Sequence, residues 1–260
     1  MVALLFKNDR IKQKRSEIMA KKKKKKKLRV DRVAFVAIIG IALLFGIYKG
    51  ASFIGEHIVS LFLSYSHPTV EAKVEKNYRA TVVLDPGHGG IDAGANAGKL
   101  HEKNISLTTA KAIGEALEKE NIKAVYTRTS DEALHEDKVT DLNMRAQMSQ
   151  THNAKYFVSI HVNDYDKSND VTGFEVYTRN KESENLAKAI SQQIAKLNYS
   201  KDRGLQDGSS LAVLKNNTVP SVLVELGYIH GPDYQYLNDN QKLKQIGIAI
   251  SQGIIELIDK

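Results

Sequence analysis

The sequence predicts an α/β fold: a single domain with a central, mostly parallel or mixed sheet flanked by helices, preceded by an N-terminal transmembrane helix. Three observations predict it. Short apolar strands alternate with helical stretches from residue 79 to the C-terminus. A charge-free apolar run follows a strongly basic leader. The length, 260 residues, suffices for one ordinary domain and an additional segment.

The positive charge is confined to the leader. The whole chain carries a formal charge of +8, but residues 1–32 hold 14 Lys and Arg, including the run 21–27, against three acids. The other 228 residues hold 24 basic and 27 acidic residues. A basic tail on an anionic membrane leaflet explains this pattern better than nucleic-acid binding, so we expect no nucleic acid as a partner.

The apolar run predicts a membrane anchor. Residues 33–48 contain no charge, and Lys49 can reach the interface, so the predicted span covers 33–54. The basic side stays in the cytoplasm, which predicts a single-pass protein of the cell membrane with its C-terminal body outside. A cleaved signal peptide is a weaker alternative, because the leader is long and no small-x-small site follows.

The chain therefore divides into four parts. Residues 1–32 form a basic cytoplasmic tail, 33–54 the signal anchor, 55–78 a juxtamembrane segment and linker, and 79–260 the folded domain. Within this domain, β-rich apolar runs predict strands at 80–84, 123–128, 156–162, 173–178, 212–214 and 221–226. Apolar residues at helical spacing predict helices over 105–120, 142–150, 186–197 and 243–257.

Four residues with metal-ligand or acid–base chemistry lie where predicted elements meet. His88 follows the first strand between glycines, Glu102 precedes the first helix, and His161 lies near the end of the third strand. Taken singly, each has an ordinary alternative: a loop histidine, a helix N-terminal charge and a core histidine. Glu225 lies inside the most apolar strand, where an unpaired carboxylate is costly, which favours a functional role.

Together these residues predict a zinc hydrolase. The absence of cysteine excludes a thiol enzyme and restricts any metal site to histidine and carboxylate. Two imidazoles and a carboxylate, here His88, Glu102 and His161, suit catalytic Zn²⁺ with an open fourth position. A separate glutamate, Glu225, can accept a proton from water and deliver it to a leaving amine.

The ordered motifs DPGHGG, HEKN, DLNMRAQ, YFVSIHVND and LKNNTVPSVLVELGYI resemble those of the zinc-dependent N-acetylmuramoyl-L-alanine amidases, the bacterial cell-wall amidases. The resemblance covers about residues 81–259. It implies zinc ligands at His88, Glu102 and His161 and a catalytic Glu225. It also matches Arg145, with a structural or substrate-side role, and Asn163, two residues after the second histidine.

The resemblance implies cleavage of the amide between the lactyl group of N-acetylmuramic acid and L-alanine of the peptidoglycan stem peptide. Only 63 residues separate His161 from Glu225, so we expect no inserted autoinhibitory helix; the sequence does not indicate an activator. Two alternatives remain open: another zinc peptidase acting on the stem peptide, and a catalytically silent wall-binding regulator on the same fold.

Overall fold

The computed structural model describes residues 76–165 and 167–260, together with Ile39, Ile41, Leu44, Gly46 and Lys49, all five of which are helical. The chain forms two compact units, Met1–Val74 and Glu75–Lys260. The predicted tail, most of the predicted span 33–54 and nearly all of the linker lie outside the described residues. Among the residues that the structure does describe, no helix has the length and apolarity needed to cross a membrane.

A six-stranded mixed sheet forms the centre of the folded unit. Its order is β4 (Ile122–Tyr126), β1 (Ala80–Pro86), β5 (Tyr156–Asn163), β8 (Ser221–Tyr228), β6 (Phe174–Thr178) and β7 (Asp202–Asp207). Only the β6–β8 pair is antiparallel; the other four pairs are parallel. A short hairpin of β2 (Asn96–Ala97) and β3 (Leu100–His101) lies outside this sheet. The predicted single α/β domain with a mixed sheet is confirmed.

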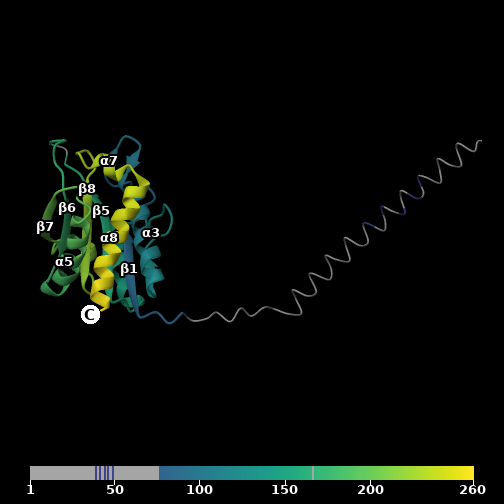
Figure 1. The fold of residues 1–260 in the computed structure, drawn as a ribbon, viewed down its shortest axis with the longest axis horizontal. Helices are drawn as coiled ribbons and strands as arrows, with labels where there is room; N and C mark the ends of the chain where they lie inside the picture. Colours follow the sequence, from purple (N-terminus) through teal and green to yellow (C-terminus); the bar gives the residue numbers. More distant parts are fainter. Residues whose placement is uncertain are drawn as a thin grey trace, which may run out of the picture. The chain divides into compact units, whose positions relative to one another are not determined.

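The helices cover the two faces of the sheet unequally. Three long helices pack on one face: α3 (Glu102–Lys119), α8 (Asn240–Ile258) and α5 (Lys181–Ala195), with α8 between the other two (Figure 1). The opposite face carries α4 (Lys138–Thr151) and the short α6 (Ala212–Lys215), while α7 (Tyr234–Leu237) follows β8. The second face is therefore the more open of the two.

Alternation along the strands builds a separate core on each face. Val82, Val158 and Val224 belong to the larger core under the three long helices. Val83, Phe157 and Leu223 point the other way and belong to the smaller core, which also contains buried residues of α6. Because side chains alternate along a strand, Asp85, His161 and Glu225 continue the second set toward the carboxyl ends of the strands. Polar groups thus replace the apolar core at this edge.

The structure differs from the predicted elements in several places. Residues 212–214, predicted as a strand, form the single helical turn α6, which is too short to show a helical period. Strand β7 was not predicted, because its sequence DRGLQD is polar and the strand lies at the sheet edge. Helices α3 and α4 also begin earlier than predicted, so Glu102 is the first residue of α3 rather than a residue preceding it.

Candidate metal centre

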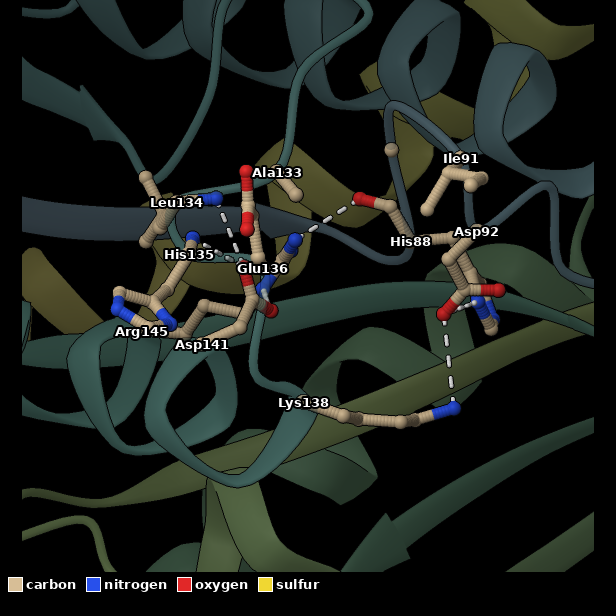
Figure 2. Close-up of a pocket in the computed structure, with 11 residues that line it drawn as sticks. His88, Ile91, Asp92, Ala133, Leu134, His135, Glu136, Lys138, Asp141 and Arg145 are labelled. Atoms are coloured by element: carbon tan, nitrogen blue, oxygen red, sulfur yellow. Dashed lines mark hydrogen bonds and ion pairs between the residues drawn. The ribbon is translucent and has the colours of Figure 1, made fainter.

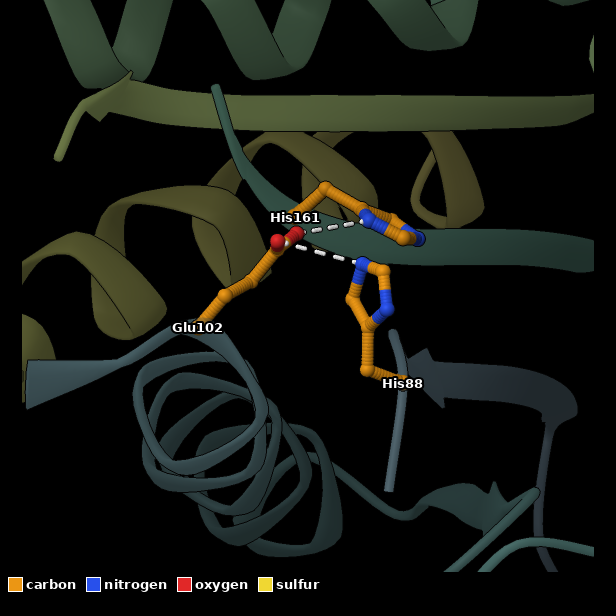
Figure 3. A group of neighbouring side chains, drawn as sticks. All are labelled: His88, Glu102 and His161. Carbon is orange, nitrogen blue, oxygen red and sulfur yellow. Dashed lines mark hydrogen bonds and ion pairs between the residues drawn. The ribbon is translucent and has the colours of Figure 1, made fainter. Parts of the chain in front are cut away.

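Three predicted ligands converge at the carboxyl edge of the sheet. His88 lies in the loop after β1, Glu102 opens α3, and His161 lies near the end of β5. One ligand atom from each residue lies within 4.8 Å of the others. The Glu102 carboxylate contacts both rings, with Oε2 at 3.1 Å from His88 Nε2 and Oε1 at 2.8 Å from His161 Nδ1 (Figure 3).

Backbone contacts fix the position of the Glu102 carboxylate. Its Oε2 accepts a hydrogen bond from the Ala95 amide at 2.8 Å, and its Oε1 accepts one from the Val162 amide at 2.9 Å. The side chain is almost fully buried. Burial alone would raise its pKa, but hydrogen bonds from His161 and His88 hold the pKa of Glu102 well below its usual range. The carboxylate is therefore ionised and directed at both imidazoles.

The loop that carries His88 is held by two buried arginines. Arg145 donates to the carbonyl oxygens of Pro86 and His88, both at 2.9 Å, and Arg128 donates to those of Pro86 at 3.0 Å and Gly87 at 2.9 Å. Three consecutive carbonyl groups are thus occupied by guanidinium donors. This matters because His88 has a φ of 63°, a conformation that few non-glycine residues adopt without support.

Arg145 has the contacts of a structural residue. Its side chain is 3% exposed and pairs with Asp85 at 2.9 Å and with Asp141 at 2.5 Å. Asp85 also accepts hydrogen bonds from Thr127 and Ser159, both at 2.7 Å. These groups form a closed polar network beneath the His88 loop, with all partners buried.

Asp92 is a further acid beside His88. Its Oδ2 lies 3.0 Å from His88 Nδ1, on the opposite side of the ring from Glu102. Burial alone would lower the pKa of His88, but Glu102 and Asp92 together raise it. A carboxylate on the far nitrogen is the usual device that orients a metal-binding histidine. The sequence reasoning missed Asp92, although it lies four residues after His88.

Glu225 lies on β8 between two partner strands. It stands opposite His161 of β5 on one side and Glu175 of β6 on the other. Its Oε2 is buried and has no hydrogen-bond partner among the described residues. Burial raises the pKa of Glu225 well above its usual value, and the nearby carboxylates Glu102 and Glu175 raise it further. The group combines an unsatisfied oxygen with a raised pKa, the direction in which a carboxyl group is tuned to accept a proton and then donate it near neutral pH.

Asn163 lies in a neighbouring network rather than in the His–Glu–His cluster. Its Nδ2 donates to Glu175 Oε2 at 3.2 Å, and the same carboxylate accepts from Tyr177, Tyr228 and Arg203 at 2.8, 3.0 and 2.5 Å. Glu175 was also missed by the sequence reasoning. Its signal was weak, since FEVYT reads as an ordinary strand. The network fixes the strand beside Glu225.

Two adjoining cavities border the centre on the open face. The larger, of about 900 Å³, extends from His88 along the loop after β4 and is shown in Figure 2. The smaller, of about 200 Å³, reaches His161 and Leu223. The two share His88, Asp92, Lys138, Asp141 and Arg145 in their walls. A long ligand can therefore lie across the centre instead of entering a closed pocket.

The donor set fits a metal ion, because two imidazoles and a carboxylate with converging ligand atoms are a usual set for Zn²⁺. The fold and the site thus define an α/β domain with a candidate metal centre at the carboxyl edge of its sheet. The family model described as N-acetylmuramoyl-L-alanine amidase matches residues 82–256, and the chain belongs to this family.

Relatives support this assignment. The probable cell wall amidase LytH of Staphylococcus epidermidis is 35% identical over 178 residues, which are 67% of this chain and 57% of that protein. The chain thus matches little more than half of that relative's length.

Among solved structures, the N-acetylmuramoyl-L-alanine amidase AmiC2 of Nostoc punctiforme is 34% identical, with a TM-score of 0.65 over 70% of this chain and 98% of that one. The CwlD amidase of Clostridioides difficile, solved in complex with the GerS lipoprotein, is 28% identical, with a TM-score of 0.61 over 69% of this chain and 98% of that one.

Proposed function

We propose that the chain is a zinc-dependent peptidoglycan amidase that cleaves the amide between the lactyl group of N-acetylmuramic acid and L-alanine of the stem peptide. One observation carries the proposal: a His–Glu–His cluster lies beside a glutamate with an unpartnered, buried carboxylate oxygen. Membership of the amidase family supports the choice of bond. The two adjoining open cavities that border His88 suit a polymeric substrate.

His88, Glu102 and His161 would hold the ion. Bound zinc would supply a water of pKa about 7 and polarise the scissile carbonyl group. Glu225 takes the proton of the attacking water on its free oxygen. It then donates that proton to the alanine nitrogen as the carbon–nitrogen bond breaks. Arg128 and Arg145 keep the His88 loop in place throughout, and Asp92 orients the His88 ring.

A single digestion experiment tests this function. The purified full chain is incubated with peptidoglycan, and the products are analysed by mass spectrometry. We expect intact stem peptides with free L-alanine amino termini. The Glu225→Gln substitution should lower their release roughly 10²- to 10⁴-fold while bound zinc, measured by metal analysis, stays unchanged. Chelation should abolish release, and added zinc should restore it.

Glu184→Gln serves as the matched control, because Glu184 is exposed on α5, pairs with Lys188 and lies outside the site. It should leave release unchanged. Cleavage further along the stem peptide would instead identify a zinc peptidase, and binding without cleavage would identify a silent wall-binding protein. Activity that survives both chelation and Glu225→Gln would exclude the zinc mechanism.

We also propose that residues 33–54 anchor the protein in the cell membrane with its N-terminus in the cytoplasm and its catalytic domain outside. The basic leader supports this orientation, and peptidoglycan lies on the outer side. Protease added to intact wall-free cells should digest the domain 79–260 and spare the leader. Protection of the domain would contradict the orientation, and release of the domain into the medium would indicate a cleaved signal peptide.

A further inference from the structure

The two cavities beside the metal centre contain one cation with an exposed head group. Among the described residues that line them, Lys138 and Arg145 carry permanent positive charge. Arg145 is 3% exposed, and its guanidinium is occupied by Asp85, Asp141 and two carbonyl groups. The Lys138 side chain is 73% exposed. Lys138 is thus the cation that a bound substrate can reach.

Lys138 lies close to the proposed reaction centre. It is the first residue of α4 and extends toward Asp92, with Nζ 3.5 Å from Asp92 Oδ2 (Figure 2). The same oxygen lies 3.0 Å from His88 Nδ1. The ammonium group is therefore separated from a proposed zinc ligand by a single carboxylate oxygen, and it lines both cavities.

The pair with Asp92 leaves the ammonium available. A pair this long and exposed is worth little by itself. Asp92 keeps its contact with His88 and a 3.1 Å hydrogen bond from the Gly94 amide whether or not Lys138 is present. The lysine can therefore turn toward a ligand anion, and its flexible stem and three donors suit that role.

The proposed substrate offers an anion on one side only. The muramic acid unit is uncharged, because its amino group is acetylated and its lactyl carboxyl forms the scissile amide. On the peptide side, the second residue is a D-glutamate joined through its γ-carboxyl, which leaves an α-carboxylate free unless that group is amidated. Two residues of extended chain place this carboxylate about 7 Å from the scissile carbonyl.

We propose that Lys138 is a specificity-determining residue that binds the free α-carboxylate of the second stem residue and directs the stem peptide along the larger cavity. Ile91, Ala133 and Leu134 give this cavity apolar walls against which the alanine methyl group can pack. The inference rests on the proposed amidase function. It predicts that the enzyme discriminates between stem peptides with a carboxylate and those with a carboxamide at this position.

A competition experiment tests the inference. Soluble glycan strands carrying either form are mixed in equal amounts and digested by the zinc-loaded full chain, and mass spectrometry gives the ratio of the two rates. We expect the wild type to favour the free carboxylate about three- to tenfold, as for one exposed ion pair in a favourable geometry. Lys138→Gln should bring the ratio close to one, mainly by slowing cleavage of the carboxylate form, and Lys138→Arg should preserve the preference.

Lys188→Gln is the control, because Lys188 is an exposed lysine on α5 paired with Glu184, and it should keep the wild-type ratio. Cleavage of both strands with a wild-type ratio of one, or an equal loss on both strands in Lys138→Gln, would overturn the role of Lys138 and leave the amidase function standing. Cleavage of neither strand by the wild type would overturn the proposed function and this inference with it.

Discussion

Gly87 leaves room for the metal centre at the position just before His88. A Cβ atom built on Gly87 would overlap the ring of His161. A similar restriction applies to Gly94, whose added Cβ would meet the Glu102 carboxylate and the His88 ring. Gly87 differs from Gly94 in having no positive φ, so its substitution tests space alone. The glycines of this loop therefore serve the packing of two imidazoles and a carboxylate.

We predict that Gly87→Ala lowers zinc affinity roughly 10- to 100-fold, as when a partner that orients a ligand is lost. The reason is displacement of His161 from the position it shares with His88 and Glu102. Competition with a chromophoric chelator measures the affinity, and circular dichroism follows stability. Gly98→Ala is the control: Gly98, unlike Gly87, has a positive φ, but it has open space around it, so this variant should lose stability without losing zinc affinity. Equal zinc affinity in Gly87→Ala and the wild type would refute the prediction.

The sequence predicted the candidate ligands and, through the family resemblance, Arg145, but not the other residues that hold the ligands in place. His88, Glu102, His161 and Glu225 are recognisable because each is unusual in its local pattern: between glycines, at a strand end, or inside an apolar strand. Their roles as ligands and base remain predictions. Arg128, by contrast, ends an ordinary strand sequence, and its carbonyl partners come from a different strand and from α3. Tertiary partners of this kind leave no local period in the sequence.

At the scale of elements, hydrophobic periodicity succeeded wherever an element buries a regular face. Helix α8 illustrates this, since Leu243, Ile246, Ile250 and Ile254 are all buried and were all used to predict it. Strand β7 could not be predicted from periodicity, because it is an edge strand paired on one side only and its polar residues reach solvent. Helix α6 could not be predicted either, because a single helical turn has no measurable period.

The close packing of α8 was not visible in its periodicity. A Cβ atom on Gly247 would approach Ala112 and the Thr109 carbonyl of α3 to 2.8 Å, and one on Gly253 would approach the Ala189 backbone of α5 to 2.8 Å. Glycine thus lets α8 lie close to both neighbouring helices at once. This layer covers one face of the sheet and leaves the site to the other face.

For the whole molecule, two buried groups predict how stability depends on pH. Burial alone would raise the pKa of Asp85, but Arg145, Thr127 and Ser159 hold it below its usual range. A lowered folded-state pKa contributes stability above the unfolded value of about 3.9 and loses it as the pH falls. Burial raises the pKa of Tyr199 well above 10, while its hydroxyl donates to the Leu226 carbonyl at 2.5 Å. Its contribution is present below about pH 10 and is lost as the pH rises further.

We therefore expect the free energy of unfolding, measured by urea titration with chelator present, to fall below about pH 4 and above about pH 10. Between these limits it should decline gradually, because the raised pKa values of His88 and Glu225 favour protonated forms that are lost as the pH rises. Tyr199→Phe should reduce the alkaline fall and leave the acid limb unchanged. An alkaline limb as steep in Tyr199→Phe as in the wild type would show that Tyr199 does not contribute to it.

The direction of β1 determines where a tether or a fused partner would be attached relative to the site. This seven-residue strand begins next to the point where the chain enters the folded unit and ends at the His88 loop, about 20 Å further on. Arg79, at that entry point, pairs with Asp259, so both ends of the folded unit meet there (Figure 1). A tether or a fused partner at either terminus would therefore be attached at the end of the domain opposite the His88 loop. The two cavities beside the metal centre would then lie away from that attachment point.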